Sequence, residues 1–408
     1  MKYIILVGDG MGDFPLPELD NKTPLEAANT PAMDMLCQKG ELFQLQTIPD
    51  DMHPGSDIAN LSLLGYEPQK FYTGRAPLEA ASMGIEIVQE ETAYRCNLVT
   101  LEKQENGSLT MVDFSAGHIS TAESNILINE LQQELGSELF HFYPGISYRH
   151  LMVASNSLSG LQTEPPHDHI GKDITKYWNR YLEYPQLKTL MEKARTLLES
   201  HEINRTRVSR GQLPANSIWL WGEGKSPTIP TIQELFGLKG SLISAVDLLK
   251  GIGVYGGLRI IEVEGATGYL DTNYAGKAQA ALDSLQDNDF VFVHVEAPDE
   301  AGHQGKIAEK VQAIEDFDQK IVKPVFEGLQ HLPGSPDFRL VICMDHLTPI
   351  SIRTHSDQPV PVVLYDSRQT GQQSGVPYTE KNGAQSGVLL SDGQQFFNKL
   401  LQKEEEAP

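Results

Sequence analysis

The sequence has few cysteines, no long apolar run and little positive charge. Its three cysteines, Cys37, Cys96 and Cys343, lie far apart and form no CxxC pair, so they indicate neither a disulfide framework nor a cysteine zinc site. The first apolar run, residues 3–7, is interrupted at Gly8, too early for a signal peptide or a membrane span. We therefore expect a cytoplasmic protein, with Cys343 as a buried thiol.

The shortage of positive charge excludes some partners. Lysine and arginine number 32 against 55 aspartates and glutamates, a formal charge of −23, which argues against broad attraction to nucleic acids or anionic membranes. A small anionic substrate would therefore need local positive charge, which bound divalent cations can supply. A length of 408 residues, of which 40% are hydrophobic, predicts an ordinary globular protein of two domains.

Short apolar runs alternate with helical patterns at both ends of the chain. Buried parallel strands are predicted at residues 3–7, 217–221, 258–263, 290–295 and 338–344, with a further strand at 360–365. Helices are predicted at 31–39, 275–285 and 307–329. This alternation indicates an α/β fold in which helices cover both faces of a mostly parallel sheet.

The middle of the chain has a different pattern. It predicts strands at 95–101, 109–114 and 148–154 and amphipathic helices at 121–135 and 186–200. We interpret it as an inserted α+β domain, residues 83–212, within a discontinuous larger domain of residues 1–82 and 213–408. The acidic tail, 403–408, is expected to fray.

Acidic side chains follow three of the apolar runs. Asp9, Asp299 and Asp345 each come just after a predicted strand, and ligands of open α/β sheets collect at the carboxyl ends of strands. An aspartate at such a place is more often a turn or cap residue. The coincidence of three of them in one predicted sheet favours a functional site.

Histidines accompany these aspartates. His303 lies four residues after Asp299, on the same face of a helical turn, and His346 is adjacent to Asp345. His355 is nine residues further on and could complete such a site. A lone histidine is more often a surface or core residue, but aspartate and histidine together are the ligands of a metal site.

Ser56 lies near the start of a predicted amphipathic helix, after His53, Pro54 and Gly55. The commoner role of a serine in this place is to cap the helix. A helix N-terminus also favours anions, and a metal ion at the hydroxyl would favour the alkoxide. Ser56 is therefore a candidate nucleophile for phosphate.

Several longer runs carry a family resemblance. They are VGDGMGD from Val7, PGSDIANLSLLGY from Pro54, TGRAPLEAAS from Thr73, AGHIS from Ala116, PANSIWLWGEG from Pro214, EAPDEAGHQG from Glu296, MDHLTP from Met344 and RTHS from Arg353. In order, spacing and identity they resemble the cofactor-independent (2,3-bisphosphoglycerate-independent) phosphoglycerate mutases of the archaeal type. This family belongs to the alkaline phosphatase superfamily, so the resemblance implies an alkaline-phosphatase-like sheet.

The resemblance implies two divalent metal ions, with manganese expected and zinc, cobalt or magnesium open. It assigns one ion to Asp299, His303 and His355 and the other to Asp9, Ser56, Asp345 and His346. It further implies that Ser56 accepts the phosphoryl group as phosphoserine and returns it to the other hydroxyl of glycerate, which interconverts 3-phosphoglycerate and 2-phosphoglycerate.

Substrate contacts are predicted at Arg75, His118, Arg149 and, from a looser match, Lys250. Either arginine could instead form a surface ion pair, and His118 could cap the helix that begins near Ser120. His118 and Arg149 belong to the predicted insert, so we expect domain closure to complete the site and exclude water.

Other functions stay open at the level of sequence. The segment around His53 and the run 218–221 resemble a bacterial branch of the family that includes proposed homoserine kinases, although no GxxxxGK[ST] loop is present. A phosphatase on the same scaffold would let water resolve the phosphoserine, and a catalytically silent metal-binding protein is a third alternative. The expected partner is small phosphorylated phosphoglycerate rather than nucleic acid or membrane. No pattern indicates an oligomeric state.

Overall fold

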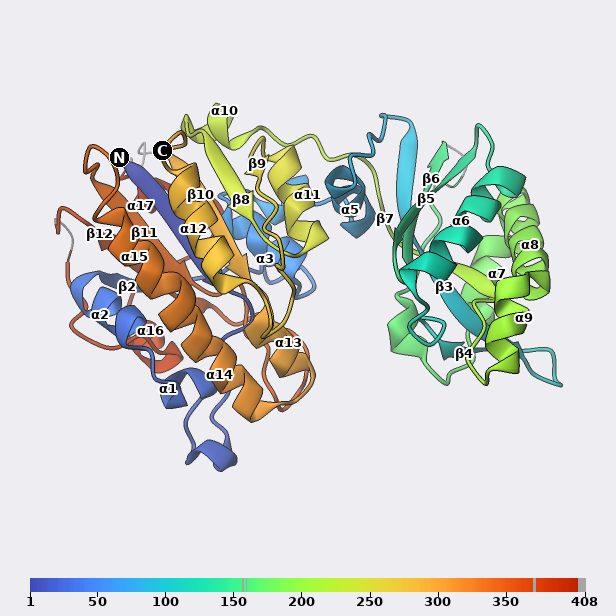
Figure 1. Ribbon diagram of the computed structural model, residues 1–408, viewed down its shortest axis with the longest axis horizontal. Helices are drawn as coiled ribbons and strands as arrows, with labels where there is room; N and C mark the ends of the chain where they lie inside the picture. The colour runs from blue at the N-terminus through green and yellow to red at the C-terminus, as the bar shows by residue number, and fades with distance from the viewer. Residues whose placement is uncertain (156–157, 159, 370–371, 403–408) are drawn as a thin grey trace. The chain divides into compact units, whose positions relative to one another are not determined.

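The computed structural model describes residues 1–155, 158, 160–369 and 372–402, which fall into two compact units (Figure 1). The larger unit comprises Met1–Tyr72 and Thr228–Pro408, and the smaller comprises Thr73–Pro227. The smaller unit therefore begins before the predicted insert, 83–212, and ends after it. The tail expected to fray, 403–408, lies outside the described residues.

A mostly parallel β-sheet forms the centre of the larger unit (Figure 1). Its strands, in spatial order, are β13 (Leu389–Leu390), β2 (Glu41–Leu45), β12 (Val360–Asp366), β11 (Phe338–Cys343), β1 (Lys2–Gly8), β10 (Phe290–Val295), β8 (Gly240–Ile243) and β9 (Arg259–Ile260). From β11 to β9 neighbouring strands are parallel, whereas β12 is antiparallel to both β11 and β2. The central strands β10 and β11 are buried along their whole length and mostly apolar, because helices cover both faces of the sheet.

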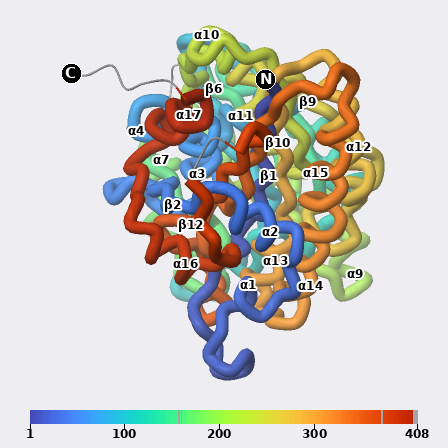
Figure 2. The backbone as a smooth tube through the Cα atoms, turned by 90° about the vertical axis from the view of Figure 1, so that its left-hand side faces the viewer, coloured from blue at the N-terminus to red at the C-terminus, as the bar shows by residue number. Residues whose placement is uncertain are grey.

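The helices of the larger unit are α1 (Pro24–Ala27), α2 (Pro31–Lys39), α3 (Ser56–Leu63), α4 (Pro68–Phe71), α10 (Ile232–Phe236), α11 (Asp247–Tyr255), α12 (Tyr274–Ser284), α13 (Ala297–His303), α14 (Ile307–Phe317), α15 (Lys323–Leu329), α16 (Glu380–Gln385) and α17 (Gly393–Leu401), with short η1 (Pro17–Leu19). Figure 2 shows α12 and α15 on one side of the sheet and α3 and α17 on the other. This arrangement confirms the α/β fold with helices on both faces.

Local sequence signals explain which helix predictions were accurate. Proline at the first helical position starts α2, and α12 begins after the Asn273 side chain that caps it. The predicted helix at 307–329 is one continuous segment, but its middle is a π-helix, η3 (Asp318–Val322), between α14 and α15. Helical periodicity alone does not distinguish these helix types.

Two strand predictions were wrong. The run 217–221 belongs to β7 (Ser217–Gly224), which pairs antiparallel with a strand of the smaller unit and not with the central sheet. The run 258–263 forms a strand only at β9. The short strands β2 and β8 were not predicted. An apolar run indicates burial, but it does not identify the sheet that buries it.

The smaller unit is an antiparallel α+β structure, as predicted for the middle of the chain. Its strands are β3 (Glu91–Lys103), β4 (Leu109–Asp113), β5 (Phe140–Ile146), β6 (Arg149–Ser155) and β7, and its helices are α5 (Arg75–Ser82), α6 (Thr121–Leu135), α7 (Thr175–Leu182), α8 (Pro185–Ser200) and α9 (Glu202–Ser209), with short η2 (Pro166–His169). Long β3 pairs with β4, β6 and β7. Trp219, Tyr181 and Leu198 lie in its apolar core.

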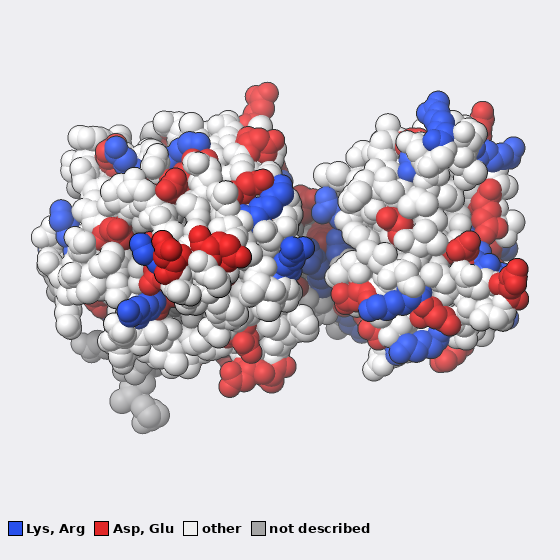
Figure 3. All heavy atoms as spheres, turned by 90° about the horizontal axis from the view of Figure 1, so that it is seen from below, with Lys and Arg blue, Asp and Glu red and all other residues white. Residues whose placement is uncertain are grey.

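Both units carry charged side chains of either sign on their surface. Acidic and basic side chains are mixed over each unit on the face drawn in Figure 3. Within the described residues, no helix is both long and apolar enough to cross a membrane. The three cysteines are free and buried, and burial raises the pKa of the Cys96 thiol well above its usual value.

Glu380 in α16 should make stability depend on pH. Its carboxylate accepts hydrogen bonds from Asp13 N and Thr23 Oγ1, and burial raises its pKa from 4.5 to about 7. A raised folded-state pKa means that the native chain binds more protons than the unfolded chain across this window, so stability falls as pH rises from 4.5 to 7. Glu380→Gln should remove about 2 kcal/mol of this fall, measured by urea unfolding at about pH 5 and about pH 8. Exposed Glu264→Gln is the control, and an unchanged pH dependence in Glu380→Gln would contradict the expectation.

Candidate metal and phosphoryl-transfer site

The three predicted aspartates meet at one end of the central sheet. Strand β1 lies between β10 and β11 and is parallel to both, with Gly8 opposite Val295 and Val7 opposite Cys343. Asp9 follows β1 directly, Asp345 comes two residues after the end of β11, and Asp299 lies in the first turn of α13, just after β10. The sheet order therefore brings together residues that are far apart in the sequence.

One cluster of donors contains Asp299, His303 and His355. Asp299 and His303 are one turn apart on α13, with His303 Nε2 3.2 Å from Asp299 Oδ2. His355 Nε2 lies 3.0 Å from His303 Nε2 and 3.6 Å from Asp299 Oδ1. The Arg353 carbonyl oxygen contacts His303 Nδ1 at 3.0 Å and so orients the ring.

A second cluster contains Asp9, Asp345, His346 and Ser56. His346 Nε2 lies 3.6 Å from Asp9 Oδ1 and 3.4 Å from Asp345 Oδ2. The same nitrogen lies 3.0 Å from Ser56 Oγ. All seven predicted ligands therefore lie together within the larger unit.

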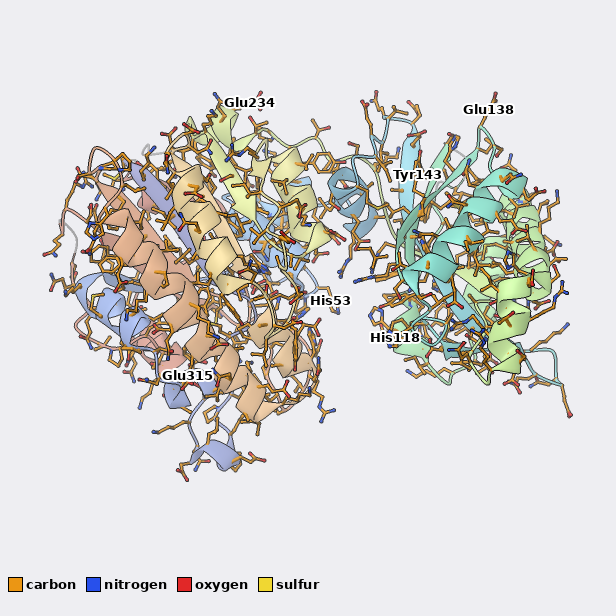
Figure 4. All side chains as sticks on the ribbon, in the orientation of Figure 1. His53, His118, Glu138, Tyr143, Glu234 and Glu315 are labelled. Atoms are coloured by element: carbon orange, nitrogen blue, oxygen red, sulfur yellow. The ribbon has the colours of Figure 1, made fainter. Side chains whose placement is uncertain are left out.

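Ser56 is not the N-cap of its helix. Gly55 occupies that position, and Ser56 is the first residue of α3. Its hydroxyl points to His346 instead, at the end of the helix where the backbone N–H groups favour anions. His53 lies on the loop before α3 (Figure 4).

Buried charges of the same sign make the site dependent on a counter-charge. Burial and the nearby carboxylates of Asp345 and Asp299 raise the pKa of Asp9 well above its usual value. Burial also favours the neutral form of Asp299, but a hydrogen bond from His303 and the charge of His346 hold its pKa below the usual range. Buried carboxylates this close together are stable as anions only when cations neutralise them.

The donors fit divalent metal ions. Among the described residues, Asp299, His346 and His355 form one set and Asp9, Asp345 and His346 another in which single donor atoms lie within 4.8 Å of one another. Asp9 Oδ1 is buried and has no hydrogen-bond partner, which fits an oxygen that serves as a metal ligand. Mixed carboxylate and imidazole donors suit manganese, zinc or cobalt.

Sequence reasoning missed several residues that hold these ligands. Asn60 Nδ2 donates to Asp345 Oδ2 and to the Ser56 carbonyl, both at 2.9 Å, and its spacing of one turn from Ser56 could have indicated this. His294, the one histidine in the apolar strand β10, lies 3.2 Å from Asp9 Oδ2. Thr348 Oγ1 contacts both His346 Nδ1, at 3.2 Å, and Asp299 Oδ1, and no sequence signal distinguished it.

In the smaller unit, Arg75 belongs to a network around one carboxylate. Glu79 accepts hydrogen bonds from Arg75 Nε at 3.1 Å and from buried Arg95 Nε at 2.9 Å. Burial disfavours the charged form of Glu79, but Arg95, Arg75 and Arg149 together lower its pKa. Arg95 also stacks 4.0 Å above the Trp221 ring. The structure thus brings predicted Arg75 and Arg149 near a buried Arg95 that was not predicted.

His118 lies in the smaller unit (Figure 4), and its ring is close to two aromatic rings. Its ring is 6.0 Å from Tyr148 and 6.5 Å from Phe114, measured between centroids, and Arg149 lies 5.8 Å from the Tyr148 ring. His118 has a positive φ of 50° and does not cap α6, because Ser120 fills that role. His118 and Arg149 therefore flank the same tyrosine.

Glu79→Gln should destabilise the smaller unit. The change leaves the buried Arg95 guanidinium without its anionic partner, which costs about 3 kcal/mol of unfolding free energy in comparable buried pairs. Urea unfolding followed by tryptophan fluorescence measures the loss, since Trp219 and Trp221 lie in this unit. Exposed Glu183→Gln is the control, and equal stability of both variants would show that the Arg95 pair contributes nothing.

Lys250 is the only predicted substrate contact in the larger unit. It lies on α11, where its amine is 3.0 Å from Glu262 Oε2 and 3.6 Å from Asp247 Oδ1. Its ion-pair partners are exposed, so the pair contributes little to stability. Its role in substrate binding stays a prediction.

The sheet and its clustered donors define an α/β protein with a site for divalent metal ions. A family model described as 2,3-bisphosphoglycerate-independent phosphoglycerate mutase matches residues 37–204. A relative of that name from Methanosarcina mazei is 50% identical over 397 residues, which cover 96% of this chain and 98% of the relative. The chain therefore belongs to the archaeal-type family of 2,3-bisphosphoglycerate-independent phosphoglycerate mutases.

Further relatives and solved structures agree with this family. A Geobacter sulfurreducens protein described as a probable member is 48% identical over 99% of this chain and all of its own length. A solved protein of Pyrococcus horikoshii is 28% identical, with a TM-score of 0.82 over 100% of this chain and 99% of that chain. A cofactor-independent phosphoglycerate mutase of Thermoplasma acidophilum is 27% identical, with a TM-score of 0.65 over 98% and 99% of the two chains.

Proposed function

We propose that this protein interconverts 3-phosphoglycerate and 2-phosphoglycerate through a phosphoserine at Ser56, with two divalent metal ions. The observation that carries the proposal is the place of Ser56 Oγ, at the N-terminus of α3 and 3.0 Å from His346 Nε2, beside the clustered donors. The names of relatives that are about half identical over nearly the whole chain support the same reaction.

Bound at this site, divalent ions would lower the pKa of the serine hydroxyl and neutralise charge on the phosphoryl oxygens. Asp299, His303 and His355 would hold one ion, and Asp9, Asp345, His346 and Ser56 the other. Manganese is our expectation for both, since mixed nitrogen and oxygen donors accept it.

The residues of the chain then have defined tasks. Ser56 Oγ loses its proton and forms a bond to phosphorus, while the bond from phosphorus to the glycerate oxygen breaks and that oxygen takes up a proton. In the second half the other glycerate hydroxyl loses a proton and forms a bond to phosphorus, while the bond from phosphorus to Ser56 Oγ breaks and Ser56 Oγ takes up a proton. Atoms and charge balance without bisphosphoglycerate or a nucleotide.

Substrate recognition needs cations for the phosphate and carboxylate groups. We assign this role to Arg75, Arg149 and Lys250, and a contact to the glycerate hydroxyls to His118. The ion pair of Arg75 with Glu79 supports the assignment, because it holds the guanidinium in one orientation. A mutase must also keep water from the phosphoserine, which separates it from a phosphatase.

Homoserine phosphorylation is the weaker alternative. Three relatives that are 48–51% identical to this chain are named as phosphoglycerate mutases, one of them as a probable one, which favours the mutase reaction. The alternative keeps the same nucleophile and metal ligands, so only the products distinguish the two reactions.

The test is a coupled assay of the purified protein with manganese and 3-phosphoglycerate, without bisphosphoglycerate. Formation of 2-phosphoglycerate that a chelator abolishes, and that added manganese restores, would support the proposal. A parallel incubation with homoserine and ATP, analysed for O-phosphohomoserine, tests the alternative. Release of inorganic phosphate without 2-phosphoglycerate would replace the mutase by a phosphatase.

A further inference from the structure

A buried lysine lies behind the metal ligands. Lys310 is on α14, and its side chain is completely inaccessible to solvent. Its amine donates three hydrogen bonds, to Gly12 O at 2.9 Å, to Asp13 Oδ2 at 2.9 Å and to Thr348 O at 2.8 Å. Every N–H of the ammonium group is therefore used.

The three acceptors belong to two segments that carry metal ligands. Gly12 and Asp13 lie just after Asp9, in the loop that leaves β1. Thr348 lies just after His346, in the loop that leaves β11. Lys310 itself follows α13, the helix that carries Asp299 and His303. One amine therefore joins the ligand segments of three neighbouring strands.

Asp13 extends this connection. Its carboxylate accepts a hydrogen bond from Phe14 N to Oδ1 at 2.8 Å and another from Ile350 N to Oδ2 at 3.1 Å. The backbone adds a hydrogen bond from Thr348 N to Gly12 O at 3.1 Å. The loop after β1 and the loop after β11 are therefore cross-linked around the Lys310 amine.

Thr348 links this cross-link to the donors themselves. Its carbonyl accepts from Lys310, and its hydroxyl contacts Asp299 Oδ1 and, at 3.2 Å, His346 Nδ1. A methyl group on Gly302 of α13 would lie 2.6 Å from the Thr348 carbonyl oxygen, so the helix packs directly on this residue. A shift of Thr348 would therefore move ligands of both clusters.

A general stabilising role explains these contacts less well. A buried ion pair is weak evidence for stability, because apolar residues of the same volume often serve as well. Here two of the three acceptors are backbone carbonyls in the ligand loops, which an apolar side chain could not hold. We propose that Lys310 is a positioning residue, which fixes the loops of Asp9 and His346 so that their donors bind metal. The inference rests on the proposed metal site.

The test compares manganese affinity of Lys310→Met with that of the natural chain. Residues that orient metal ligands typically contribute 10- to 100-fold to affinity, so we expect the dissociation constant to rise at least about tenfold. Free Mn²⁺ is counted by its electron paramagnetic resonance signal during titration, at a temperature where both proteins are folded. The matched control is Leu329→Ala, which opens a cavity under α15, away from the ligand loops, and should keep its affinity.

A second variant tests the same inference if Lys310→Met does not fold. Asp13→Asn keeps the size of the side chain but removes the charge that Lys310 contacts, so it should also weaken manganese binding several-fold. If both changes act through one cross-link, the double variant should lose less affinity than the product of the single losses. Two changes that weakened binding independently would instead give a double variant whose loss of affinity equals the product of the single losses.

Affinity of either folded variant within twofold of the natural chain, or an equal loss in Leu329→Ala, would overturn the inference. These results can be separated from failure of the proposed function. If the natural chain forms 2-phosphoglycerate with manganese but Lys310→Met binds manganese normally, only the role of Lys310 is wrong. If the natural chain binds no manganese, the metal site and the inference both fail.

Discussion

Ser56→Ala is expected to reduce mutase turnover by a factor on the order of 10⁴ or more, because the variant lacks the atom that accepts the phosphoryl group. The fold should be unchanged, since Ser56 Oγ contacts only His346 among the contacts that we observe for it. The coupled assay measures turnover, and thermal unfolding measures stability. Mass spectrometry after incubation with substrate should detect a phosphoryl group on the natural chain and none on the variant.

The matched control is Ser62→Ala. Ser62 lies on the same helix, α3, and is buried, so the substitution tests whether loss of any serine hydroxyl there reduces activity. We expect turnover close to that of the natural chain. Near-normal turnover of Ser56→Ala, or equal losses in the two variants, would contradict the assignment of the nucleophile.

Asp299→Ala and Asp345→Ala are expected to give the largest losses of metal. Each aspartate is assigned to a different ion, so each variant should lose one ion per chain, with affinity at that position at least about 100-fold weaker. Mutase activity should fall with the metal content, because both ions act on the same phosphoryl group. Equilibrium dialysis followed by elemental analysis measures the stoichiometry.

Asp287→Ala provides the comparison for these variants, because Asp287 is an exposed aspartate outside the site. Its metal content should equal that of the natural chain. If Asp299→Ala and Asp345→Ala also kept both ions, the two residues would be removed from the set of ligands. Loss of both ions in each variant would instead show that the two positions are filled cooperatively.

The larger unit shows which strands the sequence patterns could predict and which they could not. The runs that became β1, β10 and β11 were predicted within a few residues, because a strand that is buried on both faces is mostly apolar. The same signal misassigned the run 217–221, because β7 is equally buried in another sheet. Strand β2 was missed because polar residues interrupt its apolar ones, and β8 has only four residues.

The candidate site was also predicted in part from the sequence. Three aspartates after apolar runs and Ser56 before a helix were visible in the sequence, and the family resemblance assigned them to two ions. The supporting residues Asn60, His294 and Thr348 were not found, because their importance depends on contacts with distant segments. For the same reason Arg95 and Glu79 became visible only with the fold of the smaller unit.

By itself, the sequence was enough to predict the α/β class, an inserted α+β region, the family and a set of candidate residues for metal binding and phosphoryl transfer, because these follow from local patterns and motifs. Tertiary structure alone decided which strands are neighbours, which hydroxyl faces His346 and how Lys310 joins the ligand loops. The physical reason is that strand order sets which side chains meet, and strand order is established by contacts between residues hundreds of positions apart.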